Sequence, residues 1–247
     1  MNSLVCVSKT PETTARIAFT EDGSAFDTEG VQYIMNPYDE WYALVRAVEL
    51  KESKGGQVTL INVGPSSNET IIRKGLAIGA DEAVRVEADE DITSLFVAKQ
   101  IATYAEENDI DIIFLGKETI DYNGSEVGPM VAEMLDIPFI SYASKLEEEN
   151  DSFIAERDVE GGVERIKLDA PFVISAAKGL AEQRIPNMRG IMMAKRKPLE
   201  TIDPVDAPDY AYSVHFELPP PKGEVTLVEP DNMEELVRLL HEDAKVI

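Results

Sequence analysis

Short apolar runs alternate with amphipathic stretches along about the first 145 residues of the chain. Four of these runs have the length and composition of buried β-strands, and they cover residues 4–7, 58–63, 83–86 and 110–115. Helical features follow each run, at about residues 37–51, 67–78, 91–105 and 125–135. Strands that alternate with helices of this length predict βαβ units joined by right-handed crossovers. We therefore expect an α/β fold with a doubly wound, mostly parallel, Rossmann-like sheet.

Individual residues predict where these helices begin and end. Pro37 suits the first turn of a helix, because its missing N–H has no partner there in any case. Ser67 or Asn68 is expected to cap the second helix with its side chain, and Gly79 to end that helix. Asp91 is expected to begin the third helix.

The pattern changes after residue 145. Two strand-like runs at residues 153–158 and 163–167 flank a Gly-Gly pair and predict a β-hairpin. A further short strand is expected at residues 172–176. Residues 203–223 are rich in proline, and a last helix is expected at about residues 231–243.

A long irregular arm that ends in a short amphipathic helix is unusual inside a compact domain. We therefore divide the chain into an α/β nucleotide-binding domain (residues 1–200) and a C-terminal arm and helix (residues 201–247). The arm is expected to pack on a partner subunit. The alternative is an ordinary C-terminal helix that docks on its own domain.

Charge excludes some classes of partner. Lys and Arg number 23 against 47 Asp and Glu, for a formal net charge of −24. Such a surface is a poor partner for nucleic acid and for anionic membranes. A self-repelling cytosolic protein accounts for this charge, and adaptation to high salt is the alternative. No apolar run is long enough for membrane insertion, and no basic segment followed by a long apolar one opens the chain, so we expect a cytoplasmic protein.

Candidate catalytic and metal-binding groups are few. Cys6 is the single cysteine and the chain has two histidines, so neither a disulfide nor a metal site is expected. Cys6 lies in an apolar strand and is interpreted as an inert core thiol. No G-x-S-x-G or H-E-x-x-H motif occurs. We expect no catalytic residues.

Ligands of open parallel sheets bind beyond the carboxyl ends of the strands. Three segments leave such ends: residues 6–10, 62–67 and 116–128. The third contains small residues that let the backbone approach a ligand, and it leads into a helix whose free N–H groups favour a phosphate. It matches neither a Walker loop nor G-x-G-x-x-G. A nucleotide site and a plain surface loop both remain open here.

Residues 178–197 form a basic segment in an acidic chain. It has six Lys or Arg against one Glu, and it also holds Met188, Met192 and Met193. Flexible methionines beside cations suit an adaptable docking surface. The alternative is a solvated loop whose methionines turn inward.

Several of these segments together resemble the beta (small) subunits of electron-transfer flavoproteins, along nearly the whole chain. The matching pieces, in the family's order, are LVCV (4–7) with TTARI (13–17), NPYDE (36–40), VGP (63–65), AIGAD (77–81), LGKETID (115–121), VGPM (127–130), EGG (160–162) and GIMMAK (190–195). Each piece alone is weakly specific, but their joint order is strongly specific.

The resemblance implies an adenine-nucleotide-binding type of α/β fold in an electron carrier subunit without catalysis of its own. It implies a heterodimer with an alpha subunit that holds the redox-active FAD, and a structural AMP in the beta subunit. Adenine is then expected near Cys6, Asn36 and Val63, with the phosphate at the turn of residues 124–127. The residues that it assigns to the nucleotide are Cys6, Asn36, Pro37, Tyr38, Asp39, Val63, Gly116, Lys117, Glu118, Thr119, Ile120, Asp121, Tyr122, Asn123, Gly124, Ser125, Glu126 and Val127.

The chain departs from the family at two of these positions. Glu126 stands where the family commonly has Gln, and Val127 where some members have a hydroxyl. A carboxylate beside a phosphate is unfavourable unless it points away or binds a cation. Gln100, Lys117 and Ser125 are the candidates to compensate.

The basic segment aligns with the loop by which the family's dehydrogenases recognise the flavoprotein, at about residues 183–197. The docking residues that it implies are Ile185, Met188, Arg189, Ile191 and Lys195, with Met188 as the apolar anchor. Electrons would pass from acyl-CoA and related flavin dehydrogenases to the FAD, and then to a quinone oxidoreductase. This implies a part in fatty acid oxidation.

Two other hypotheses remain open. An electron-bifurcating member of the family would hold a second FAD in place of AMP and oxidise NADH. A stand-alone nucleotide-binding or hydrolysing protein of a related fold is the other. Such enzymes commonly carry Ser-Gly-Gly after the first strand, where this chain has VSKTP at residues 7–11.

Overall fold

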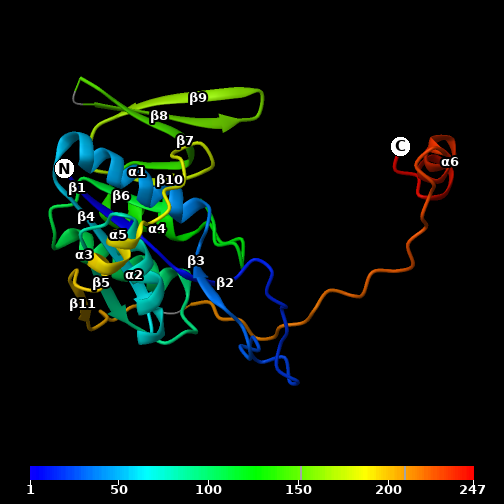
Figure 1. Ribbon diagram of the computed structural model, residues 1–247, viewed down its shortest axis with the longest axis horizontal. Helices are drawn as coiled ribbons and strands as arrows, with labels where there is room; N and C mark the ends of the chain where they lie inside the picture. Colours follow the sequence, from blue (N-terminus) through cyan, green and yellow to red (C-terminus); the bar gives the residue numbers. More distant parts are fainter. Residues whose placement is uncertain (151, 209) are drawn as a thin grey trace. The chain divides into compact units, whose positions relative to one another are not determined.

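The computed structural model describes residues 1–150, 152–208 and 210–247 (Figure 1). The contacts within the chain divide it into two units. The larger unit comprises Met1–Ile17 and Thr28–Val214, and the smaller unit comprises Ala18–Asp27 and His215–Ile247.

A nine-stranded sheet forms the centre of the larger unit, in the order β11-β5-β4-β1-β6-β10-β7-β8-β9 (Figure 1). The strands are β1 (Asn2–Cys6), β4 (Gln57–Gly64), β5 (Glu82–Glu87), β6 (Ile112–Gly116), β7 (Phe139–Glu149), β8 (Ser152–Val159), β9 (Gly162–Leu168), β10 (Phe172–Ala176) and β11 (Leu199–Ile202). All pairs from β11 through β7 are parallel, while β7, β8 and β9 pair antiparallel. The doubly wound, mostly parallel α/β prediction is confirmed. A separate antiparallel pair joins β2 (Lys9–Pro11) to β3 (Tyr33–Met35).

Helices cover both faces of this sheet. One apolar cluster includes residues of α1 (Asp39–Lys54) and α2 (Glu69–Ile78), and α5 (Met188–Ala194) packs against α2. A second cluster includes residues of α3 (Ser94–Glu106) and α4 (Val127–Leu135). Neighbouring residues of β6 point to opposite faces, since Phe114 belongs to the first cluster and Ile113 to the second.

Several helix ends differ from the prediction. Helix α1 begins at Asp39 rather than Pro37 and ends at Lys54. A 3-10 turn, η1 (Ser66–Asn68), precedes α2, and the side chain of Asn68 donates to Asn62 Oδ1 at 3.0 Å instead of capping the helix. Thr93, not Asp91, caps α3 by accepting from the backbone N–H of Phe96. The positions of these helix ends depend on tertiary contacts of the capping residues.

The second half of the chain confirms the hairpin of β8 and β9 and the strand β10. It also shows two strands that the apolar pattern did not predict, β7 and β11. Strand β7 pairs parallel with β10 and antiparallel with β8, so it joins the hairpin to the parallel sheet. The segment expected to be a basic loop contains the helix α5.

The smaller unit has little core of its own. Phe19 stacks on Phe216 with ring centroids 5.3 Å apart, and Phe26 meets Phe19 edge-on. Gly23 has φ +66°, and a Cβ there would lie 2.2 Å from the His215 ring. The chain ends in α6 (Met233–Arg238) and the π-helix η2 (Leu239–Asp243), which bury none of their described residues. Such a segment suits packing against another surface.

Candidate functional site

The candidate site lies where the strand order of the parallel sheet reverses. From β1 the chain passes through α1 to β4 on one side, and later returns through α3 to β6 on the other side of β1. The carboxyl ends of β1 and β6 therefore lie at one edge of the sheet on neighbouring strands. Ligands of open α/β sheets bind in the crevice at such a switch point.

The loop that follows β6 folds back on itself beside this edge. The Thr119 N–H donates to the Gly124 carbonyl at 2.9 Å, and the Asn123 N–H donates to the Thr119 carbonyl at 2.8 Å. The Thr119 hydroxyl accepts from the Gly124 N–H at 3.0 Å. Asn123 takes the left-handed conformation that closes the turn, at φ 51°. The loop thus brings its tip back to the start of α4.

The N-terminus of α4 fits an anion. Glu126 is the N-cap residue, and its side chain makes no capping hydrogen bond to any described residue. Its side chain is exposed, and α4 begins at Val127. The first N–H groups of a helix need acceptors, and a phosphate can supply them. Of the groups expected to compensate for Glu126, Gln100 is occupied elsewhere, because its side chain bonds both backbone polar groups of Val205.

The segment before α1 is tied to the same loop. The Asn36 side chain donates to the Glu118 carbonyl at 3.2 Å and accepts from the Tyr38 N–H at 3.1 Å. Asn36 is almost fully buried. Gly116 is in close contact, because a Cβ there would lie 3.1 Å from both the Asp39 Cβ and the Glu40 Cγ. The structure therefore places residues 36–39 beside residues 116–118.

Beside β1, the end of β4 is held by buried polar side chains. Asn62 donates to the Val7 carbonyl at 2.8 Å, and the buried Arg85 donates to the Gly64 carbonyl at 2.8 Å. Val63 is half-buried next to this network. The Cys6 thiol is buried at the end of β1, and burial together with the nearby Glu40 carboxylate raises its pKa above the usual range. These contacts agree with a core thiol at Cys6.

Glu40 and Ser8 are site residues that the sequence pattern did not single out. The Glu40 carboxyl is buried and accepts from the Ser8 backbone N–H at 2.9 Å and from the Ser8 hydroxyl at 2.5 Å. Burial raises the pKa of Glu40 to about 8, with Asp121 and Asp39 adding to the rise, while the Ser8 hydrogen bonds oppose it. Glu40 belongs to the NPYDE motif, but the resemblance assigns it no contact with the nucleotide.

The neighbouring carboxyls are perturbed in the same direction. Burial raises the pKa of Asp39 to about 6, while Lys117 lowers it and Glu118 raises it further. Burial also raises the pKa of Asp121. Lys117 forms an ion pair with Glu118 at 2.7 Å. The edge of the sheet therefore collects carboxyls that hold protons more tightly than free ones do.

Glu40 makes folding pH-dependent in a direction that can be tested. The folded chain holds the Glu40 proton more tightly than the unfolded chain does, so binding of this proton stabilises the fold. The stabilisation is complete below the ordinary pKa of 4.5 and is lost as the pH rises through about 8. The rise in the Glu40 pKa from 4.5 to about 8 corresponds to a fall of up to about 5 kcal/mol in the free energy of unfolding across these pH values. We expect Glu40→Gln to flatten this fall and to be more stable than the wild type at pH 8. Urea unfolding at several pH values measures this.

Glu133→Gln, at an exposed position of α4, is the matched control and should keep the wild-type slope. If Glu40→Gln retains the wild-type pH dependence, the Glu40 carboxyl does not carry a shifted proton.

A groove of about 470 Å³ opens at the ends of β6 and β10. Its lining residues are Tyr38, Asp39, Tyr42, Lys117, Glu118, Ile120, Tyr142, Asp158, Ala177 and Lys178. It gathers five of the predicted nucleotide residues, namely Tyr38, Asp39, Lys117, Glu118 and Ile120. Cys6, Val63 and residues 124–127 do not line it, so the predicted nucleotide residues are not all in one hollow.

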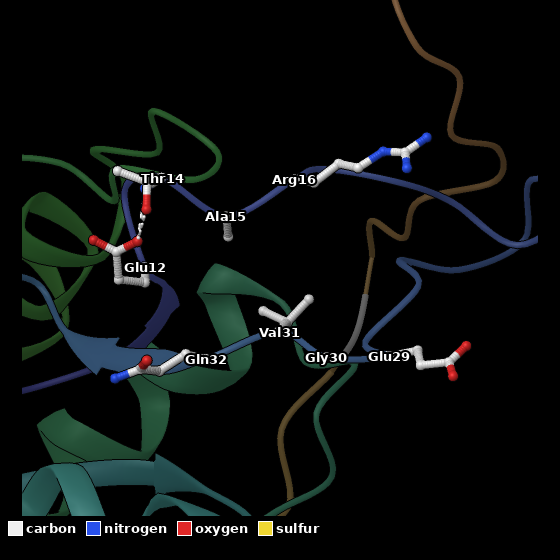
Figure 2. Close-up of a pocket in the computed structure, with 8 residues that line it drawn as sticks. All are labelled: Glu12, Thr14, Ala15, Arg16, Glu29, Gly30, Val31 and Gln32. Carbon is white, nitrogen blue, oxygen red and sulfur yellow. Dashed lines mark hydrogen bonds between the residues drawn. The ribbon is translucent and has the colours of Figure 1, made fainter.

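Figure 2 shows a second hollow, of about 250 Å³, between residues 12–16 and 29–32. The side chain of Glu12 bonds to Thr14, while those of Arg16 and Glu29 extend outward (Figure 2). None of the predicted site residues lines this hollow.

The basic segment presents an apolar face on α5. Ile185, Met188 and Met192 are 84%, 74% and 68% exposed. Ile191, Arg189 and Lys195 are also exposed. Not every cation of the segment is directed outward: Arg184 pairs with Glu52 at 2.7 Å, and Lys197 donates to the Leu76 and Ala80 carbonyls. The five predicted docking residues therefore share one exposed stretch of chain.

Among the described residues, no helix has the length and apolar character needed to cross a membrane. Within the same residues, no group of three or more His, Cys, Asp or Glu is arranged to hold a metal ion.

The sheet, its switch point and the loop after β6 define a doubly wound α/β protein with its candidate ligand edge at the carboxyl ends of β1, β4 and β6. Residues 24–207 match the family model described as the electron transfer flavoprotein domain. The chain is 38% identical over its full length to the full-length electron transfer flavoprotein subunit beta of Bacillus subtilis. It is 34% identical to the human protein of that name, with 98% of each chain covered. The chain belongs to the family of electron transfer flavoprotein beta subunits, which are parts of electron carriers.

Proposed function

We propose that the chain is the beta subunit of a cytoplasmic, heterodimeric electron-transfer flavoprotein. Its alpha partner would bind FAD, and the chain itself would hold a structural AMP. The complex would accept electrons from flavin dehydrogenases such as acyl-CoA dehydrogenases and pass them to a quinone oxidoreductase. The full-length match to beta subunits carries this proposal.

The switch-point edge is the proposed AMP site. Adenine would lie by Cys6, Asn36 and Val63, and the phosphate would accept from N–H groups at the start of α4. Two features support this placement: the uncapped N-terminus of α4 and the outward exposure of Glu126. The AMP supplies no redox chemistry, so the role of these residues is to bind and orient it.

The raised pKa values favour an anion at this edge. With a pKa of about 8, Glu40 is mostly neutral at pH 7. Lys117 adds a positive charge close to Asp39. A phosphate therefore meets less negative charge than the number of carboxyls implies.

The exposed face of α5 is the proposed docking surface for the dehydrogenase. A small apolar anchor with complementary charges gives a weak complex that exchanges quickly, as an electron shuttle requires. Gly190 holds this face in place, because α5 approaches α2 so closely that a Cβ at Gly190 would lie 2.6 Å from the Ala77 carbonyl oxygen.

A nucleotide inventory tests the proposal. The chain is purified with its alpha partner and denatured, and the released AMP and FAD are counted per heterodimer. We expect one AMP and one FAD. Two FAD and no AMP would instead assign the chain to the electron-bifurcating branch. Failure to copurify with a flavin-bearing partner would contradict the proposed function.

A further inference from the structure

The methionines of the chain differ sharply in exposure. Met35 is fully buried, and Met1, Met130 and Met134 are half-buried. The exposed ones are Met188 at 74%, Met192 at 68%, Met233 at 59% and Met193 at 49%. Three of these four lie on the seven-residue helix α5.

The packing of α5 explains why these thioethers are exposed. The helix rests on α2 through Gly190 and through Ala194, which is 2% exposed. Met188 and Met192 are four residues apart and so lie on one face of the helix. Their exposure shows that this face is turned away from α2. Solvent-borne oxidants can therefore reach these side chains.

We propose that Met188, Met192 and Met193 form a site of reversible oxidation by peroxides, and that its oxidation weakens docking of the electron donor. The second part rests on the proposed function of α5. In the reaction a thioether sulfur attacks one peroxide oxygen, the O–O bond breaks and an S–O bond forms. With hydrogen peroxide the proton of the attacked oxygen passes to the other oxygen, which leaves as water, so the sulfur is oxidised and the peroxide is reduced.

The product changes the docking surface in a defined way. A sulfoxide is polar and chiral, whereas a thioether is a flexible apolar group. Burying an S–O dipole against an apolar partner without a hydrogen bond is unfavourable, so the donor complex should weaken about tenfold. Arg189 and Lys195 keep their charges, so the salt dependence of association should persist.

The test uses the heterodimer treated with increasing hydrogen peroxide. Peptide mass spectrometry measures oxidation at each methionine. We expect Met188 and Met192 to be half oxidised at doses that leave Met35, Met130 and Met134 unmodified. Electron acceptance from an acyl-CoA dehydrogenase should fall about tenfold. Methionine sulfoxide reductases of both stereospecificities, supplied with a dithiol, should restore it.

A variant with all three residues changed, Met188→Leu, Met192→Leu and Met193→Leu, separates this site from other damage. Leucine keeps a similar volume but cannot be oxidised in this way. Each protein is compared with its own untreated form, and the variant should lose no transfer rate on peroxide treatment. An equal loss in the variant and the wild type would overturn the proposal.

The remaining outcomes separate the modification from the docking function. Oxidation spread evenly over buried and exposed methionines would overturn the site. Oxidation of the three α5 methionines with unchanged transfer would overturn the proposed effect of oxidation on docking. In that case Met188→Ala decides further: slower transfer would leave the docking function standing, and unchanged transfer would refute the docking function as well.

Discussion

Replacing Met188 by alanine is expected to slow electron acceptance from the dehydrogenase about tenfold to thirtyfold. Met188 is 74% exposed in this chain and lies between exposed Ile185 and Ile191. An apolar anchor of this kind contributes most to the binding free energy when a partner covers it and excludes water from it. The loss should appear as a higher KM for the flavoprotein as acceptor, with little change in the maximal rate, because the side chain takes no part in electron transfer itself.

Val163→Ala is the matched control for Met188→Ala. Val163 is 58% exposed, but it lies on β9, at the opposite edge of the sheet order from β11. Stopped-flow reduction of the flavin by the dehydrogenase measures the rates, and the AMP content of each variant is counted. Unaltered transfer kinetics in Met188→Ala would refute α5 as the dock.

Replacing Phe114 by alanine is expected to lower the free energy of unfolding by about 3–5 kcal/mol. Phe114 is fully buried in β6, with Val5 of β1 and Ile174 of β10 as its neighbours across the sheet. Its removal leaves a cavity under α1 that the surrounding strands cannot fill. Because native proteins have a total free energy of unfolding of about 5–15 kcal/mol, this loss is a large fraction of the total.

Urea unfolding of the purified chain measures this loss through the fluorescence of Trp41, the single tryptophan. Phe114→Leu should cost clearly less than Phe114→Ala, because it leaves a smaller cavity. Leu227→Ala, at a position that is 89% exposed, should stay within about 0.5 kcal/mol of the wild type. A loss below about 1 kcal/mol in Phe114→Ala would show that the sheet closes over the cavity.

The sequence predicted the loop of the candidate site but not the long-range contacts that hold it. Glycines, small residues and a following helix predicted that the segment 116–128 leaves a strand and leads into a helix N-terminus, and residues 117–126 do join β6 to α4. The pattern could not show that Asn36 bonds the Glu118 carbonyl or that Ser8 bonds Glu40, because these partners are 82 and 32 residues apart in the chain. The raised pKa of Glu40 depends on that burial, so no local motif reveals it.

Local sequence alone determined much about this protein. The alternation of apolar runs and helical stretches determined strands β1, β4, β5 and β6, and the Gly-Gly pair determined the β8–β9 hairpin, because hydrophobic period and turn residues act over short distances. The ordered motifs determined the family.

Tertiary structure decided the rest. It ordered the strands, placed β7 between a parallel and an antiparallel neighbour, and made α5 a helix within a basic segment. Helix α5 has seven residues, too few to be stable by propensity. It is held by close packing on α2 and by Arg73, which donates to the Ala194 carbonyl at 2.9 Å and to the Lys197 carbonyl at 2.7 Å. Such contacts join residues more than a hundred positions apart, and they exist only once the chain has folded.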